Sequence, residues 1–227
     1  MTPDELDLNL VRASAVGPVP PPRALMGDEP FIGIPARVLD FWRFGMSDLR
    51  ANTLRGLVAE FLVAQAVGSS LRRVEWAAYD VKTPDGITVE VKCSAYLQTW
   101  SQPQLSRIEF TRLRSRLDPA TNNGDAGTPD YHAAVYVFAV QAAQSHDVFN
   151  VLDLGQWIFY VAPRAAVAAT GQDSLGLNRV ARIASPGVGY DRFNEAISRA
   201  GAQAADQDLV AFDLVRTESV SPHICTP

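Results

Sequence analysis

The stretch YDVKTPDGITVEVKCSA, residues 79–95, decides the fold, because a turn signal separates two runs that are typical of strands. Apolar and polar residues alternate strictly over residues 87–94. Successive side chains of a strand point to opposite faces, so the alternation predicts an apolar core face and a polar face with Thr88, Glu90, Lys92 and Ser94. The turn between the runs then determines on which face Asp80 lies.

The tripeptide PDG, residues 84–86, favours a three-residue turn. Proline suits the first central position of a type I turn, and glycine suits the left-handed residue that follows it. With this turn Asp80 lies directly across from Glu90, and Lys92 shares their face. A two-residue turn would instead place Asp80 opposite Val91. The sequence therefore predicts two acids and one base on a single face of a hairpin.

Two opposed carboxylates on neighbouring strands need a positive charge between them. Directly opposed residues have Cβ atoms about 4.5 to 5.5 Å apart, and like charges at that distance repel. Lys92 offsets part of the repulsion between Asp80 and Glu90. Converging carboxylates are also ligands that Mg²⁺ prefers, and the bound ion can activate water and neutralise charge on a phosphate. The trio is therefore a candidate site for metal-assisted phosphodiester hydrolysis.

The arrangement resembles the PD-(D/E)XK nuclease superfamily. The residues that carry the likeness are Asp80, the tripeptide Glu90-Val91-Lys92, and Glu60 on a helix upstream. The resemblance implies that Asp80 and Glu90 bind Mg²⁺ or Mn²⁺ together with the carbonyl of Val91. It also implies that Lys92 serves the attacking water and that Glu60 assists from the helix.

The likeness covers about residues 48–140 and implies a restriction-endonuclease-like core, which is a mixed sheet flanked by helices. Ser94, two residues beyond the lysine, looks like the serine of some junction resolvases in this superfamily. Tyr79 stands where the family name has proline, at a position that varies widely. The motif is short, and residues with this spacing occur by chance in many chains. The hairpin register and the helical acid Glu60 are therefore the features that favour the assignment.

Simpler interpretations compete with the site. Asp80, Glu90 and Lys92 would form only a solvated cross-strand salt bridge if nothing binds them, and such a pair contributes about 0 to 1 kcal/mol. Glu60 lies at the border of a stripe formed by Leu54, Leu57, Val58 and Phe61, where a charge is common.

Length and composition predict an ordinary globule. The chain has 227 residues, 47% of them apolar, 20% charged, and a net charge of -5. These values fit one sizeable soluble domain. The order of the expected helices and strands predicts class α/β, with a mixed central sheet flanked by helices, or α+β if the strands are mostly antiparallel. We expect a Pro-rich extended arm over residues 1–30, a single domain over residues 31–213, and a flexible tail over residues 214–227.

The expected elements follow from periodicity, caps and turn residues. Helices are predicted from about residue 36 to 44, from 48 to 67, from 163 to 169 and from 191 to 200. Strands are predicted at about 74–82, 87–94, 106–112, 133–140 and 157–162. An exposed loop is expected over residues 118–130.

Further candidates for nucleic-acid contacts flank the hairpin. Arg112, Arg114 and Arg116 would line one side of an extended segment and could follow phosphates, although such a run is more often simply solvated. In the segment after the motif, Gln98, Trp100 and Gln102 could contact or stack on bases. The alternative for Trp100 is that it fills the edge of the core.

These observations favour a Mg²⁺- or Mn²⁺-dependent nuclease that hydrolyses phosphodiester bonds in DNA. We expect it to act as a homodimer, because one small domain with a single site needs a partner to cut both strands of a duplex. The alternative is an inactive nuclease-fold scaffold that binds nucleic acid or a protein partner. The acidic N-terminus and the lack of a long apolar run predict a cytoplasmic protein without a membrane partner. Cys93, Cys225 and the three histidines show no metal or nucleophile spacing, and no phosphate-binding or serine-hydrolase motif occurs.

Overall fold

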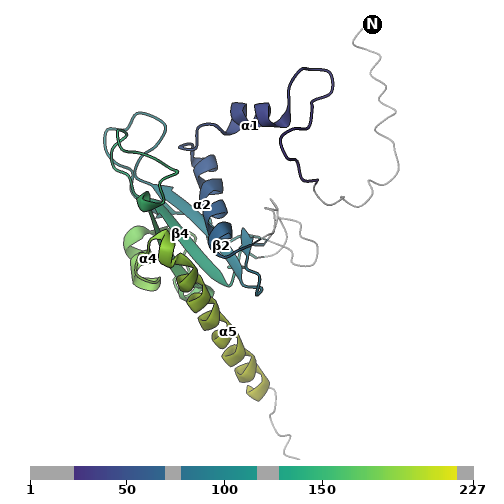
Figure 1. Ribbon diagram of the computed structural model, residues 1–227. Coiled ribbons are helices and arrows are strands. Elements are labelled where there is room, and N and C mark those ends of the chain that lie inside the picture. The colour runs from purple at the N-terminus through teal and green to yellow at the C-terminus, as the bar shows by residue number, and fades with distance from the viewer. Residues whose placement is uncertain (1–22, 70–77, 117–127, 219–227) are drawn as a thin grey trace, which may run out of the picture. The chain divides into compact units, whose positions relative to one another are not determined.

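A mixed four-stranded sheet organises the part of the chain that carries the motif. Its strands are β1 (Val81–Lys82), β2 (Thr88–Ala95), β4 (Val135–Gln141) and β5 (Trp157–Pro163), in the order β1-β2-β4-β5. β1 and β5 run antiparallel to their neighbours, whereas β2 and β4 are parallel. Helices flank this sheet (Figure 1), so the predicted α/β class with a mixed sheet is confirmed.

The computed structural model describes residues 23–69, 78–116 and 128–218. The chain divides into two compact units, Met1–Ser47 and Asp48–Pro227. The unit with the sheet thus begins at Asp48, whereas the sequence predicts its start near Phe31. The first part of the predicted arm, the start of the predicted strand at 74–82 and most of the loop at 118–130 lie outside the described residues.

The turn of the hairpin has the predicted register. Val81 pairs with Val89, and Lys82 pairs with Thr88, which leaves residues 84–86 as a three-residue loop. The N–H of Thr83 donates to the carbonyl of Ile87 at 2.9 Å and closes the loop. Gly86 has a φ of 97°, a left-handed conformation that glycine adopts without strain.

One face of the sheet is covered by α2 (Asn52–Ala66) and α5 (Phe193–Glu218). α2 contacts β2, and α5 contacts β5 and β4 (Figure 1). The apolar residues at odd-numbered positions of β2, β4 and β5 form a core with these helices. The main buried residues of this core are Ala59, Val63, Val89, Val135, Val137, Phe159, Phe193 and Ile197.

The other face has a second core. It lies beneath α3 (Arg164–Ala168), α4 (Leu177–Ile183) and a two-stranded ribbon of β3 (Glu109–Phe110) and β6 (Leu175–Gly176). The buried residues of this core include Phe110, Leu113, Tyr136, Phe138, Val140, Val167, Leu175 and Val180. The even-numbered residues of β4 point to this side. Since β2 is paired with β4 residue for residue, Glu90 and Lys92 point there too.

The helical phase predicted for α2 is wrong at Phe61, whose side chain is 59% exposed. The helix faces the sheet through Ala59, Leu62 and Val63 instead. Val58 is half-buried against the same core. The helix has apolar residues around most of its circumference, so the spacing in the sequence fits more than one phase.

Several elements differ in extent from the prediction. α5 continues through Glu218, into the segment predicted as a loose tail. α4 and β6 are short elements that the sequence pattern does not predict. In the N-terminal unit, α1 (Val38–Met46) agrees with the short helix expected there and has no buried residue. Within the described residues, no helix is long and apolar enough to span a bilayer.

Candidate active site at the β1–β2 hairpin

Glu90 and Lys92 form a close ion pair on β2. The Nζ of Lys92 lies 2.6 Å from Oε1 of Glu90, and the two side chains are 20% and 21% exposed. Both residues point toward the second core, in register with Tyr136 and Phe138 of β4. The pair is therefore partly shielded from water yet still reachable from solvent.

Asp80 is held at the edge of β2 by two hydrogen bonds. Its N–H donates to the carbonyl of Val89 at 3.1 Å, and its Oδ2 accepts the N–H of Val91 at 2.7 Å. The paired register ends at Val81, and both of these hydrogen bonds of Asp80 go to the backbone of β2 on either side of Glu90. Beyond the end of β1, the carboxylate of Asp80 thus replaces a backbone carbonyl as the acceptor for the N–H of Val91. This hydrogen bond holds the carboxylate close enough to Glu90 to affect its pKa.

The two carboxylates interact electrostatically. Burial raises the pKa of Glu90 above its ordinary value, and the negative charge of Asp80 raises it further. Lys92 lowers the same pKa by its charge and its hydrogen bond, and the charge of His132 acts in the same direction, but the net shift is upward. The ionised form of Glu90 is therefore disfavoured, first by burial and then by the charge of Asp80. A bound cation would favour that ionised form.

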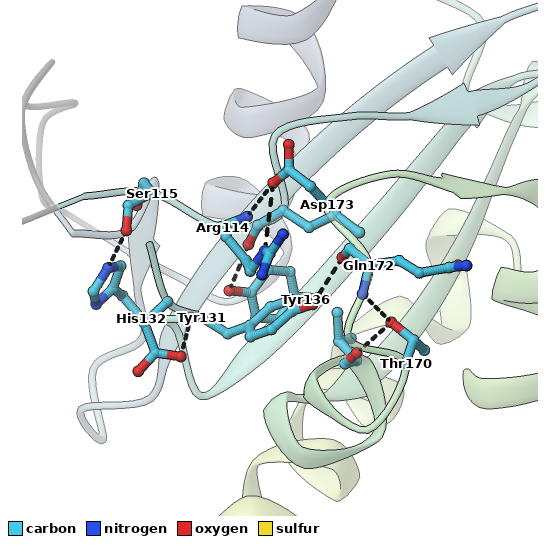
Figure 2. A network of polar contacts seen from close by, with 11 residues as sticks. Arg114, Ser115, Tyr131, His132, Tyr136, Thr170, Gln172 and Asp173 are labelled. Carbon is cyan, nitrogen blue, oxygen red and sulfur yellow. Dashed lines mark hydrogen bonds and ion pairs between the residues drawn. The ribbon is translucent and has the colours of Figure 1, made fainter. Parts of the chain in front are cut away.

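Tyr136 and His132 form the wall of the site beside Glu90. Burial raises the pKa of Tyr136, and the charge of Glu90 raises it further, so the phenol stays protonated and donates to the carbonyl of Leu113 at 3.2 Å. Nε2 of His132 lies 2.8 Å from the carbonyl oxygen of Ser115. Figure 2 shows both side chains within one polar network.

This network joins three segments that are distant in sequence. The hydroxyl of Tyr131 donates to the carbonyl of Gln172 at 2.7 Å, and the N–H of Arg114 donates to Oδ1 of Asp173 at 3.0 Å (Figure 2). Ser115 and Asp130 exchange two backbone hydrogen bonds of 3.1 Å each. The loop after β3, the approach to β4 and the loop before β6 are therefore tied together by these hydrogen bonds.

The sequence does not identify His132 or Tyr136 as part of the site. His132 has no motif spacing to any other candidate, and Tyr136 is one aromatic residue in an apolar strand. Their place beside Glu90 depends on the parallel pairing of β2 with β4, which aligns Glu90 with Tyr136. A parallel alignment between distant segments leaves no local signal in the sequence.

Glu60 belongs to the helix layer on the other face of β2. It acts electrostatically on Cys93, whose pKa rises to about 11, first because of burial and also because of the charge of Glu60, while Arg55 lowers it. Cys93 alternates with Glu90 and Lys92 along β2, so its side chain points to the face that packs on α2. The structure therefore places Glu60 apart from the face that carries Glu90 and Lys92.

The candidates that follow the motif have different environments. The Oγ of Ser94 accepts the N–H of Glu109 at 3.3 Å and ties β2 to β3. Gln98 is only 9% exposed, and its Nε2 donates to the carbonyl of Ala95 at 3.2 Å. Trp100 is 57% exposed, so it does not fill the edge of the core. The amide of Gln102 forms hydrogen bonds within its own loop.

The three arginines after β3 do not form a regular line. Arg112 has a φ of 57°, which interrupts the extended segment that the sequence predicts there. The Nε of Arg114 lies 4.0 Å from Oδ1 of Asp173, so this side chain faces an acid. Arg112 and Arg116 are exposed. The alternation of side chains that a strand would impose therefore ends at Arg112. The side chains of the three arginines do not line one side of an extended segment.

Among the residues that the structure describes, the carboxylates that interact at the hairpin are those of Asp80 and Glu90. Within the part of the chain that the structure describes, no group of three or more His, Cys, Asp or Glu side chains is arranged to hold a metal ion. A metal at the hairpin would use Asp80, Glu90 and the carbonyl of Val91, with water completing its coordination. Comparisons of the chain with protein-family models, curated proteins and solved structures find no match.

Proposed function

We propose that the chain is a nuclease that hydrolyses phosphodiester bonds in DNA with the help of Mg²⁺ or Mn²⁺. The observation that supports this function is the meeting of Asp80, Glu90 and Lys92 at one edge of the sheet. The order of a helix, a hairpin and a further strand, α2-β1-β2-β4, also agrees with the proposed PD-(D/E)XK relationship and its restriction-endonuclease-like core.

The residues at the hairpin suit a hard divalent cation. Carboxylate and carbonyl oxygens are the ligands that Mg²⁺ prefers, and Asp80, Glu90 and Val91 supply them. The pKa of Glu90 is raised first by burial and then by the charge of Asp80, and a cation bound between the two acids would favour the ionised form of Glu90. When bound, the cation would lower the pKa of a coordinated water and neutralise charge on the phosphate.

The protein's own residues would position and stabilise the reacting groups. The N–H of Val91 fixes the orientation of the Asp80 carboxylate through a 2.7 Å hydrogen bond. The ammonium of Lys92 stays beside Glu90 and can donate hydrogen bonds to an attacking water or to the oxygen on which negative charge develops. Tyr136 lies in register with Glu90, is buried and is held by its hydrogen bond to Leu113, so it limits the access of water to that side of Glu90.

Nicking of supercoiled plasmid DNA in the presence of Mg²⁺ tests the proposal. Lys92→Met and Asp80→Asn should each reduce the rate by about 100-fold or more, because each removes a group that acts on the reacting phosphate or its water. Glu109→Gln is the matched control, since Glu109 is an exposed acid on β3. Equal nicking by all of the variants would show that the activity does not come from this site.

An inactive scaffold with the same fold is the second candidate. The observation that favours it is the 2.6 Å ion pair between Lys92 and Glu90, which already compensates one carboxylate without a metal. Calorimetric titration with Mn²⁺ separates the two functions. A nuclease should bind the ion with an affinity that Asp80→Asn removes, whereas a scaffold that needs no cation should give no heat of binding in either protein.

The proposed enzyme would act as a homodimer, because cutting both strands of a duplex requires two sites and each chain supplies one. Sedimentation velocity with and without duplex DNA measures the assembly. A single-chain complex that makes double-strand cuts would rule out this mode of action.

A further inference from the structure

The loop that follows β2 is held in shape by one side chain. Its two ends meet where the N–H of Ser106 donates to the carbonyl of Tyr96 at 2.9 Å. Inside the loop, Oε1 of Gln102 accepts the N–H of Gln98 at 2.7 Å. Nε2 of Gln102 donates to the carbonyl of Tyr96 at 3.3 Å and to Oγ of Ser106 at 2.9 Å. The loop over residues 96–106 is therefore preorganised without forming a helix or strand.

This loop presents an indole to solvent. Leu97 and Gln98 are buried at 6% and 9% exposure and anchor the loop, whereas Trp100 is 57% exposed. Leu105 is also exposed, at 40%. A large aromatic side chain held in water by a fixed backbone loses little conformational entropy when it meets a flat partner. The loop is thus suited to stacking.

The charge of the segment favours an anionic partner. Residues 96–108 contain no Asp or Glu, although the whole chain has a net charge of -5. Arg107 is exposed immediately after the loop, and the first acid that follows, Glu109, is exposed on β3. An aromatic face with a nearby cation is the combination that binds single-stranded nucleic acid, because every base has a face for stacking and every nucleotide has a phosphate.

The loop is also close to the candidate site along the strand. Ala95, the last residue of β2, lies three positions beyond Lys92, which corresponds to about 10 Å at about 3.3 Å per residue. A nucleic acid strand whose phosphate lies at Lys92 would therefore have neighbouring bases at the start of the loop.

We propose that Trp100 stacks on an unpaired base, so that the DNA this protein binds contains a single-stranded segment. The inference rests on the proposed nuclease function for the location of the strand. Bases inside a duplex have both faces covered by their neighbours, and only an unpaired or frayed base offers its face to an indole. The loop would accordingly distinguish single-stranded from fully paired DNA.

Fluorescence anisotropy with labelled oligothymidylate and with a blunt duplex, in EDTA so that no cleavage occurs, tests the proposal. Trp100→Ala should weaken binding of the single strand by about 5- to 100-fold, and Trp100→Phe should retain most of the affinity. Binding of the duplex should change little. Phe61→Ala is the matched control, because Phe61 is an aromatic residue of nearly equal exposure, 59%, on α2.

The outcomes separate this inference from the proposed function. Trp100-dependent binding without any Mg²⁺-dependent nicking would support the loop and overturn the nuclease. Nicking with equal binding by wild type, Trp100→Ala and Phe61→Ala would retain the nuclease and overturn the stacking role. The stacking role would also be overturned if the protein bound no DNA. The same holds if Trp100→Ala lost self-association and kept its DNA binding. Thermal unfolding of Trp100→Ala should match wild type, because the side chain is exposed.

Discussion

At the scale of single residues, Asp80 has both a structural and an electrostatic effect. Its carboxylate accepts the N–H of Val91 and so completes the edge of β2, and its charge raises the pKa of Glu90. Replacement by asparagine keeps an acceptor for Val91 and removes the charge, whereas alanine removes both. Asparagine is therefore the informative substitution when the question is chemistry and not folding.

Glu90→Gln is expected to stabilise the metal-free protein more at high pH than at low pH. Burial and Asp80 raise the pKa of Glu90 in the folded state, so its neutral form is favoured there. A raised folded-state pKa gives stability that is fully present below the unfolded-state value and is lost as the pH rises through the folded-state value. Glutamine does not titrate, so the variant avoids that loss.

Thermal unfolding in EDTA at about pH 5 and about pH 8 measures this difference. The midpoint of Glu90→Gln minus that of wild type should be larger at the higher pH, and titrating groups that do not interact with Glu90 cancel in the subtraction. The reverse order would show that the ion pair with Lys92 outweighs burial and the charge of Asp80.

At the scale of elements, local signals were sufficient for the hairpin and insufficient for its surroundings. The residues PDG at 84–86 encode the turn directly, because proline and glycine have few compatible conformations, and the register of β1 and β2 follows. The sequence does not determine in the same way which side of α2 faces the sheet, since apolar residues lie around most of the helix. Tyr136 and His132 reach Glu90 only through pairing of β2 with β4, which joins distant segments.

Two glycine substitutions should have opposite effects on stability. Gly86 has a φ of 97° and no atom within 4 Å of an added Cβ, so alanine there meets only backbone strain, of about 1 to 2 kcal/mol. Gly56 lies inside α2, also with no atom within 4 Å of an added Cβ. Alanine at that position should stabilise the helix by about 0.5 to 1 kcal/mol.

Urea denaturation of Gly86→Ala, Gly56→Ala and wild type measures both effects. The midpoint should fall for the hairpin variant and rise for the helix variant, with similar slopes for all three proteins. If Gly86→Ala left the midpoint unchanged, the turn would accept a different conformation, and the register of β1 and β2 would not depend on Gly86.

At the scale of the whole molecule, the sheet separates two cores with different roles. The core beneath α2 and α5 borders the buried Arg55 of α2, whereas the one beneath α3 and α4 includes Tyr131 and Tyr136 of the polar network. A ligand at the hairpin therefore meets β1 and β2 directly and the second core through Tyr136. Because unfolding of the sheet destroys the site, ligand binding is linked to the stability of this entire unit.

The linkage predicts that Mn²⁺ raises the thermal midpoint of wild type. At a free concentration ten times its dissociation constant, the ion should add about 1.4 kcal/mol to the free energy of unfolding. Asp80→Asn and Glu90→Gln should lose this effect because each removes a ligand. Lys92→Met should keep it, since the ammonium is no ligand and its removal leaves both carboxylates more in need of a cation. If Lys92→Met nicks no DNA yet is stabilised by Mn²⁺, metal binding and chemistry depend on different residues of the site. Equal stabilisation of wild type and all three variants would instead show that the ion binds elsewhere on the chain.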